Sequence, residues 1–209
     1  MPSDHDPFAR LAIDPDIARA WTLPADLYTE PAVLAQEHSR LFGRTWQVAG
    51  RSEQAARPGD YFTCQVAGEP VVVVRDAGGK LRAFYNVCRH RAGPPAEGCG
   101  SRKVFRCSYH GWTYGLDGCL IAAPEFEGAQ DFRAEDFGLR PLRAEEWAAW
   151  VFVNLGDLAE PLLPSLGELP KQAQRFPLHR VRFFERREYA MQCNWKTYVD
   201  NYLDRKSVV

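Results

Sequence analysis

Two cysteine–histidine pairs constrain this chain more than any other feature. One residue separates Cys88 from His90, two separate Cys107 from His110, and sixteen residues, 91–106, lie between the pairs. Each pair follows a β-rich segment and opens a tight loop. A sheet that placed the two loops side by side would bring two thiolates and two imidazoles around one point, which is the donor set of a metal centre.

Three kinds of site use such residues. A structural zinc site normally pairs Cys with Cys and His with His, whereas each loop here carries one of each. A disulfide with two bystander histidines requires an oxidising compartment. A Rieske-type [2Fe–2S] centre places two cysteines on one iron and two histidines on the other, and therefore suits loops that each contribute both residue types. The spacing favours the Rieske-type centre, with zinc and a disulfide as the alternatives.

Composition excludes several other functions. The 209 residues contain 26 basic and 27 acidic side chains, so the charge offers no bulk attraction to nucleic acid or to a membrane surface. The longest apolar run, 147–153, is far shorter than the ~20 residues that span a bilayer. The first ten residues, MPSDHDPFAR, are acidic and contain prolines, unlike a signal peptide. We therefore expect a cytoplasmic protein with no nucleic-acid or membrane partner.

A Rieske-type, all-β antiparallel domain is expected over residues 46–156. Short β-branched and aromatic segments alternate there with Gly-, Pro- and Asp-rich turns, a pattern typical of sandwiches and small barrels. The expected strands are 46–50, 61–66, 70–76, 81–87, 103–107, 119–123, 139–143 and 149–155.

Residues 1–45 and 157–209 flank this domain and make the expected fold α+β overall. In the first segment the pattern predicts a helix over 31–46, capped by Thr29. The second begins with a Pro- and Leu-rich linker, followed by an expected strand over 180–191 and by a helix from Asn194.

Three side chains beside the expected ligands are candidates for tuning the centre. Arg89 would place a cation near the cluster sulfurs, although simple surface exposure explains it equally well. Tyr109 would offer its hydroxyl to a cysteine sulfur, and Trp112 would pack under the second loop. The other cysteines do not repeat the ligand spacing, and Cys99 has no paired histidine.

The motif Cys88-x-His90…Cys107-x-x-His110-Gly111-Trp112 resembles the Rieske domain of ring-hydroxylating oxygenase α subunits, including choline- and carnitine-type monooxygenases. Respiratory-chain Rieske proteins differ, because two further cysteines join their loops by a disulfide. The residues at those two positions here are Gly93 and Tyr109. The likeness runs from the lead-in segment 23–51 to NWKTYVDNYL at 194–203, which a stand-alone Rieske ferredoxin-like electron carrier, the alternative, does not need.

The resemblance implies that residues 157–209 begin an α+β, helix-grip-like catalytic domain. In the family, that domain holds a mononuclear Fe(II) with two histidines and a carboxylate. Asn201 matches an asparagine near that iron, and Asp204 falls where an acidic residue relays electrons between subunits. An NAD(P)H-dependent reductase, directly or through a ferredoxin, would supply electrons to a homotrimer. The trimer would hydroxylate an aromatic or quaternary-ammonium small molecule with O₂, as a monooxygenase or a dioxygenase.

The ligands of this second iron are missing from the sequence. Outside the two pairs the histidines are His5, His38 and His179, and none of them follows Asn201. The final six residues, DRKSVV, also read as a translated sequencing adaptor. We therefore expect a C-terminally truncated subunit without oxygenase activity of its own, whether the truncation is natural or artefactual; in the second case Asp204 is a coincidence.

Overall fold

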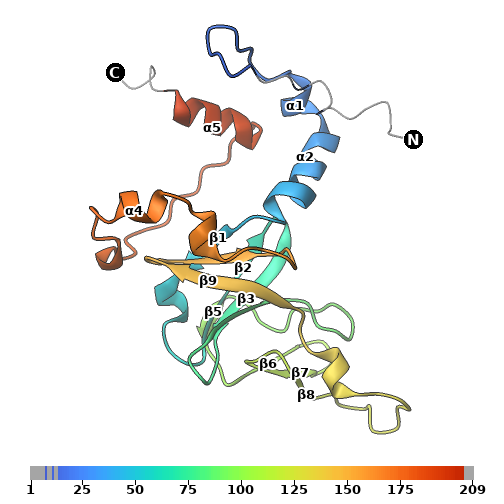
Figure 1. Cartoon of the computed structure of the whole chain (residues 1–209). Coiled ribbons are helices and arrows are strands. Elements are labelled where there is room, and N and C mark those ends of the chain that lie inside the picture. Colours follow the sequence, from blue (N-terminus) through green and yellow to red (C-terminus); the bar gives the residue numbers. More distant parts are fainter. Residues whose placement is uncertain (1–7, 9–10, 12–13, 205–209) are drawn as a thin grey trace. The chain divides into compact units, whose positions relative to one another are not determined.

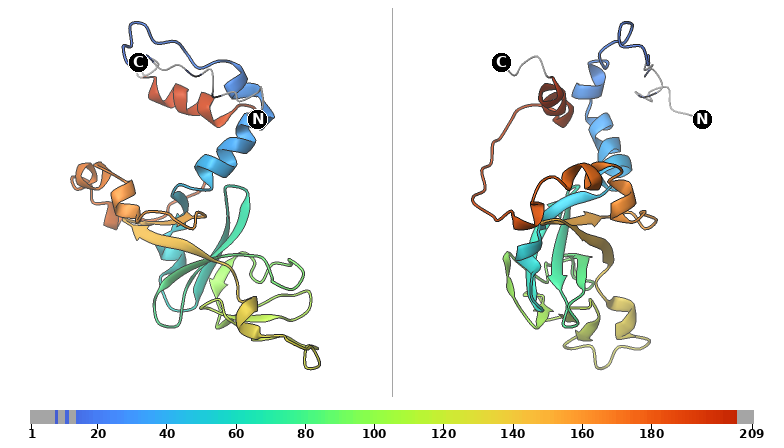
Figure 2. Two further views of the ribbon diagram at one scale, coloured as in Figure 1. Left: turned by 45° about the vertical axis from the view of Figure 1, so that its right-hand side comes forward. Right: turned by 60° about the vertical axis from the view of Figure 1, so that its left-hand side comes forward.

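The structure, a computed structural model, describes residues 8, 11 and 14–204. The chain divides into two compact units (Figures 1 and 2). One unit is Ser39–Phe183; the other combines the described residues up to His38 with those from Phe184 onwards. Within the described ranges, no helix has the length and apolar character needed to cross a bilayer.

Antiparallel strands build the Ser39–Phe183 unit, which confirms the expected β domain. A seven-stranded sheet has the order β1-β10-β9-β4-β3-β2-β5. Its strands are β1 (Gln47–Arg51), β2 (Asp60–Val66), β3 (Glu69–Arg75), β4 (Leu81–Tyr85), β5 (Cys99–Ser101), β9 (Pro141–Trp147) and β10 (Trp150–Asn154). A separate three-stranded sheet contains β6 (Val104–Arg106), β7 (Thr113–Gly115) and β8 (Leu120–Ala122).

The large sheet curls, so that its central strands are buried on both faces. Val71 to Val74 on β3 are all fully buried, which explains why this strand is a continuous valine run and not an alternating one. Although β1 and β2 are not neighbours in the sheet, a Cβ added to Gly50 on β1 would lie 2.6 Å from the Phe62 ring on β2. The curl therefore closes the sheet towards a half-barrel (Figure 2).

Two apolar clusters fill this unit. One lies inside the curl and includes Phe62, Val71, Val73, Val151 and Val153. The other joins the two sheets, since it combines residues of β2, β3 and β4 with residues of β6, β7 and β8. This second cluster also contains both motif cysteines, Cys88 and Cys107, so the expected ligands belong to the core between the sheets.

The segment after β10 packs onto the sheet. It contains two short helices, α3 (Leu162–Ser165) and α4 (Leu169–Ala173). The Trp46 indole N–H donates to the Glu160 carbonyl at 2.9 Å. This segment was expected to begin a linker to a second domain, but up to Phe183 it shares a compact unit with the strands.

The second unit is helical, with α1 (Asp26–Thr29), α2 (Pro31–Glu37) and α5 (Trp195–Leu203). The helix predicted over 31–46 is present in part: α2 ends at Glu37, a π-helical segment continues over His38–Phe42, and the last four predicted residues are not helical. Thr29 does not cap α2. It ends α1, and its hydroxyl donates to the Ala25 carbonyl.

A buried carboxylate joins α2 to α5. Glu37 accepts hydrogen bonds from the Lys196 ammonium at 2.5 Å and from the Trp195 indole N–H at 2.8 Å. The Tyr28 hydroxyl of α1 donates to Asp200 at 2.7 Å, and this bond raises the pKa of Tyr28. The helix expected from Asn194 is α5, and Asn194 caps it by accepting the Lys196 backbone N–H.

The predicted strand over 180–191 is wrong. After a 3-10 turn at Leu178–Arg180 the backbone has no ladder partner in the described chain, and its side chains are exposed. Arg186 pairs with Glu188 and Arg187 with Glu185, both locally. A β-rich composition forms a strand only when a neighbouring strand accepts its backbone hydrogen bonds.

Candidate metal centre

The two ligand loops share one backbone conformation. The Cys88 N–H donates to the Gly93 carbonyl and the Ala92 N–H donates back to the Cys88 carbonyl. The second loop repeats this pattern, with Cys107 bonded to the Trp112 carbonyl and Gly111 to the Cys107 carbonyl.

The fourth residue after each cysteine has a positive φ. The angle is 59° at Ala92 and 74° at Gly111, so both loops turn at the same point. Two equivalent turns, one after β4 and one after β6, therefore present a cysteine and a histidine each.

The four expected ligands converge. Cys88 and Cys107 are 4% and 3% exposed, and both belong to the apolar cluster between the sheets. The rings of His90 and His110 lie 4.6 Å apart between centroids. Burial raises the pKa of the Cys107 thiol, while the backbone N–H groups of Tyr109 and His110 act in the opposite direction. Two sulfurs and two imidazoles thus form one group at the edge of the core.

Two buried ring nitrogens at these loops have no hydrogen-bond partner in the described chain. Among the described residues, His90 Nδ1 and Trp112 Nε1 are buried without a hydrogen-bond partner. A buried imidazole nitrogen in this condition costs free energy unless it binds something. A Cβ added at Gly93 would stand 3.1 Å from Cys107 Sγ, so only a glycine leaves the space beside this sulfur open. The donor set and its surroundings fit a [2Fe–2S] centre with two cysteines and two histidines.

Tyr114, and not Tyr109, brings its hydroxyl to a ligand sulfur. The Tyr114 hydroxyl lies 3.2 Å from Cys88 Sγ, and it accepts the Arg89 backbone N–H at 3.0 Å. Burial, followed by the contact with Cys88, raises the pKa of Tyr114. The expected role of Tyr109 is therefore corrected. Its ring is 61% exposed and packs against the His110 ring at 3.8 Å.

Trp112 is buried against the first ligand loop. It is 1% exposed, and its ring stacks on the His90 imidazole at 5.0 Å with an interplanar angle of 9°. Phe126, Phe132 and Phe137 surround the indole with ring contacts of 5.1 to 5.8 Å. These three residues could not be predicted from the sequence, because the segment 123–138 carries no strand or helix periodicity.

A cavity of about 600 Å³ opens beside the first loop. Cys88 and His90 belong to its lining, together with Arg89, Arg91 and Arg140. The Arg89 guanidinium has a buried Nε without a hydrogen-bond partner in the described part of the chain. A cation thus lies next to the first ligand pair.

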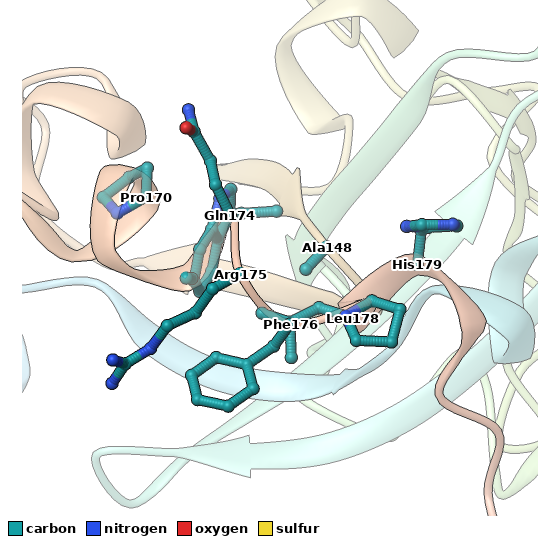
Figure 3. A pocket seen from close by; sticks show the side chains of 10 residues that line it. Ala148, Pro170, Gln174, Arg175, Phe176, Leu178 and His179 are labelled. Carbon is teal, nitrogen blue, oxygen red and sulfur yellow. The ribbon is translucent and has the colours of Figure 1, made fainter.

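A second hollow, of about 460 Å³, lies between the β9–β10 turn and the segment after α4. Figure 3 shows Arg175 and Phe176 projecting together from this segment, with the His179 imidazole apart from them. The Arg175 guanidinium lies 4.9 Å from the centroid of the Phe176 ring. No cysteine lines this hollow, so it is separate from the ligand loops.

The remaining candidates belong to the helical unit or stand alone. Asn201 lies on α5, and Asp204 follows that helix directly. Burial raises the pKa of the Cys64 thiol to about 11, as expected for a cysteine packed in a sheet. Across the described residues, no three Cys, His, Asp or Glu side chains come close enough to hold a single metal ion, so the four loop residues fit only a centre in which each of two irons takes two of them. The DRKSVV segment beyond Asp204 lies outside the described residues.

Comparison with known proteins identifies a domain family for the part of the chain that carries the ligand loops. Residues 45–133 match the family described as the Rieske [2Fe-2S] domain. This range contains both ligand loops, Tyr114 and two of the phenylalanines around Trp112.

Several proteins with longer chains are similar to this one. Choline monooxygenase of Beta vulgaris is 40% identical over 199 residues, covering 91% of this chain and 44% of the relative. The carnitine monooxygenase oxygenase subunit of Acinetobacter pittii is 37% identical over 195 residues, with 91% and 52% covered. A crystal structure of a quaternary ammonium Rieske monooxygenase, CntA, with L-carnitine superposes with a TM-score of 0.83 at 34% identity, covering 88% of this chain and 53% of that one.

The chain belongs to the Rieske oxygenase α-subunit family, whose curated relatives are oxidoreductases. It spans about half the length of the relatives that it matches.

Proposed function

We propose that this chain binds a [2Fe–2S] centre, with Cys88 and Cys107 on one iron and His90 and His110 on the other. The observation that carries this proposal is the repeated loop conformation, which brings two buried thiols and two imidazoles together and leaves His90 Nδ1 unpartnered. Such a centre supplies one-electron transfer, and imidazole ligands raise its potential above that of all-cysteine clusters.

Neighbouring residues hold and tune the donors. The Tyr114 hydroxyl uses one lone pair for the Arg89 N–H and therefore points its proton at a Cys88 thiolate. Trp112 fixes the plane of the His90 ring by stacking, and Tyr109 covers one face of His110. Arg89 adds positive charge beside the first loop.

The intact protein, we infer, is the oxygenase subunit of a monooxygenase that acts on a quaternary ammonium compound. Support comes from the names of the relatives, which are choline and carnitine monooxygenases. An aromatic substrate has weaker support, because the aromatic-ring dioxygenase structures cover less of the chain. The inferred partners are an NAD(P)H-dependent reductase, with or without a ferredoxin, and two further copies of the subunit.

The residues after Phe183 would begin the catalytic domain, with Asn201 near a mononuclear Fe(II). No histidine occurs after Asn201 in these 209 residues, so they do not supply the ligands of the second metal. The activity proposed for these 209 residues is therefore electron transfer alone.

Metal and sulfide analysis of the purified chain tests the proposal. We expect about two irons and two acid-labile sulfides per chain, and a Rieske-type EPR signal after reduction. Cys107→Ser should abolish the bound iron and sulfide and the EPR signal. Cys99→Ser, which changes an exposed cysteine outside the loops, should keep all three. Tightly bound zinc without labile sulfide would contradict the proposal.

A further inference from the structure

The segment after β8 contacts both ligand loops, and we refer to its residues 123–133 as the strap. A Cβ added to Gly111 of the second loop would lie 3.5 Å from Pro124 Cγ. The Phe126 ring packs against His90 of the first loop, with 5.7 Å between the ring centroids. One segment of the chain thus contacts both loops, although the loops follow strands of different sheets.

Apolar side chains attach the strap to the β unit. Among the described residues, the backbone hydrogen bond found within 123–132 is internal, from the Ala129 N–H to the Phe126 carbonyl. Phe126 and Phe132, with Ala123 at the start of the strap, are partly buried against the cluster between the sheets. The other side chains of the strap are exposed. Its position therefore depends on these few apolar contacts.

Phe126 completes a cluster of three rings with His90 and Trp112. The His90 and Trp112 rings stack with an interplanar angle of 9° and 5.0 Å between centroids. Phe126 stands almost perpendicular to both, at 88° to His90 and 83° to Trp112, and its centroid lies 5.7 Å and 5.1 Å from theirs. Each ring contacts the other two, so the imidazole cannot turn about its Cβ–Cγ bond without displacing a neighbour.

This restraint matters because a histidine side chain has little intrinsic preference for one ring orientation. Its second side-chain torsion is broad and roughly two-fold. A half turn exchanges Nδ1 with Cδ2, and a ring carbon does not bind a metal. In the structure His90 Nδ1 is buried and has no hydrogen-bond partner among the described residues, so packing must hold this orientation.

We propose that Phe126 is a positioning residue, which holds the His90 imidazole in the orientation that leaves Nδ1 free for an iron. This inference rests on the proposed [2Fe–2S] function and adds to it a residue that lies outside both ligand loops. His110 is held differently, since its ring packs against the exposed ring of Tyr109. A change at Phe126 should therefore affect one ligand histidine and not the other.

Three substitutions in the strap separate positioning from general packing. Phe126→Leu removes the ring and keeps an apolar side chain. The matched control is Phe132→Leu, because Phe132 contacts Trp112 at 5.8 Å and Phe126 at 4.9 Å but has no ring contact with His90 in the described chain. Phe126→Tyr is the conservative variant, which keeps the ring. A purely structural contribution predicts equal effects of the two leucine variants, because both loosen the strap.

Iron release from the oxidised centre to a chelator at fixed pH measures how firmly the ligands are held. We expect release from Phe126→Leu to be about tenfold faster than from Phe132→Leu, an effect typical of removing a partner that orients a metal ligand. Pulsed EPR of the reduced chain, with isotope-labelled histidine, measures the couplings of the two ligand nitrogens. One coupling should change in Phe126→Leu, and neither should change in Phe132→Leu or Phe126→Tyr.

NMR relaxation of the iron-free chain requires no cluster and separates this proposal from the proposed function. The order parameter of the His90 Cδ2–H bond reports whether the ring is held. A chain that never binds iron would overturn the proposed function, yet a lower order parameter in Phe126→Leu alone would still support positioning.

Three results would overturn the positioning role. The first is a His90 ring that is already mobile in the wild-type chain. The second is equal order parameters and equal iron-release rates in Phe126→Leu and Phe132→Leu. The third is a Phe126→Tyr variant that behaves like Phe126→Leu, since its ring should restore the wild-type values.

Discussion

The Tyr114 hydroxyl oxygen lies 3.2 Å from Cys88 Sγ, and it accepts the Arg89 backbone N–H at 3.0 Å. A hydrogen bond donated to a ligand sulfur stabilises the more negative, reduced form of an iron–sulfur centre.

Tyr114→Phe should therefore lower the reduction potential of the centre. A charged hydrogen bond contributes about 1.5–3 kcal/mol, and the part that differs between oxidation states corresponds to a fall on the order of tens of millivolts. Spectroelectrochemistry of the loaded chain measures this change. Tyr109→Phe is the control, because its ring is exposed and the potential should stay the same. A larger fall in the Tyr109 variant would reverse our assignment of the two tyrosines.

Gly118→Ala should destabilise the β unit strongly. Gly118 has a φ of 91°, and a Cβ there would overlap the buried ring of Phe84. Backbone strain and overpacking together predict a loss of about 2–4 kcal/mol in the free energy of unfolding. Gly79→Ala shares the positive φ, at 81°, but meets nothing within 4 Å, and should cost about 1 kcal/mol. Urea unfolding of both variants measures the difference, and equal losses would refute the contribution of Phe84.

Glu37→Met should loosen the helical unit. It leaves the Lys196 ammonium, 8% exposed, without its carboxylate, and an uncompensated buried charge costs about 3–5 kcal/mol. Hydrogen exchange in α5 should accelerate while exchange in β2 and β3 stays slow. The double variant Glu37→Met/Lys196→Met removes both charges and should recover most of the protection. If it exchanged as fast as the single variant, the ion pair would not be the cause.

Asp76→Asn should reduce the free energy of unfolding at neutral pH and make this free energy less dependent on pH in the acidic range. Asp76 accepts hydrogen bonds from Arg82 at 2.6 Å and from two backbone N–H groups of the β3–β4 turn. The bond from Arg82 is the main reason why the pKa of Asp76 is lowered.

A carboxyl whose pKa is lower in the folded chain stabilises the fold above its unfolded value of about 3.9 and loses this effect as the pH falls through the folded value. Wild-type stability should thus decline below about pH 5 more steeply than that of Asp76→Asn. Denaturant midpoints between pH 7 and pH 3 measure this slope. Glu127→Gln, which changes an exposed carboxylate, should keep the wild-type slope.

Local sequence predicted most strands and the two loops that carry the cysteine–histidine pairs. The four proposed ligands lie in these short loops, whose conformation depends on adjacent residues, so their spacing could be recognised without the fold. Tyr114 was not predicted because it reaches Cys88 from β7, a three-residue strand whose partners are β6 and β8. Tyr109 is closer to the ligands in sequence, but the turn directs it to the surface.

Predictions failed where structure depends on distant partners. The segment 180–191 has the composition of a strand, yet within the described chain no other strand pairs with it. The apolar pattern over 31–46 likewise does not predict that the backbone changes from α-helical to π-helical hydrogen bonding at His38. Periodicity predicts which side chains share a face of a helix, but not which residues from distant parts of the chain those side chains will contact.

The two ligand loops come from different sheets. Cys88 and His90 follow β4 of the seven-stranded sheet, whereas Cys107 and His110 lie between β6 and β7 of the small one. No ladder hydrogen bonds join these sheets in the described structure. A centre bound by all four residues would therefore act as a cross-link, and its binding free energy would add to the cohesion of the fold. Iron supply would then set how long the small sheet survives proteolysis, apart from any electron that the centre carries.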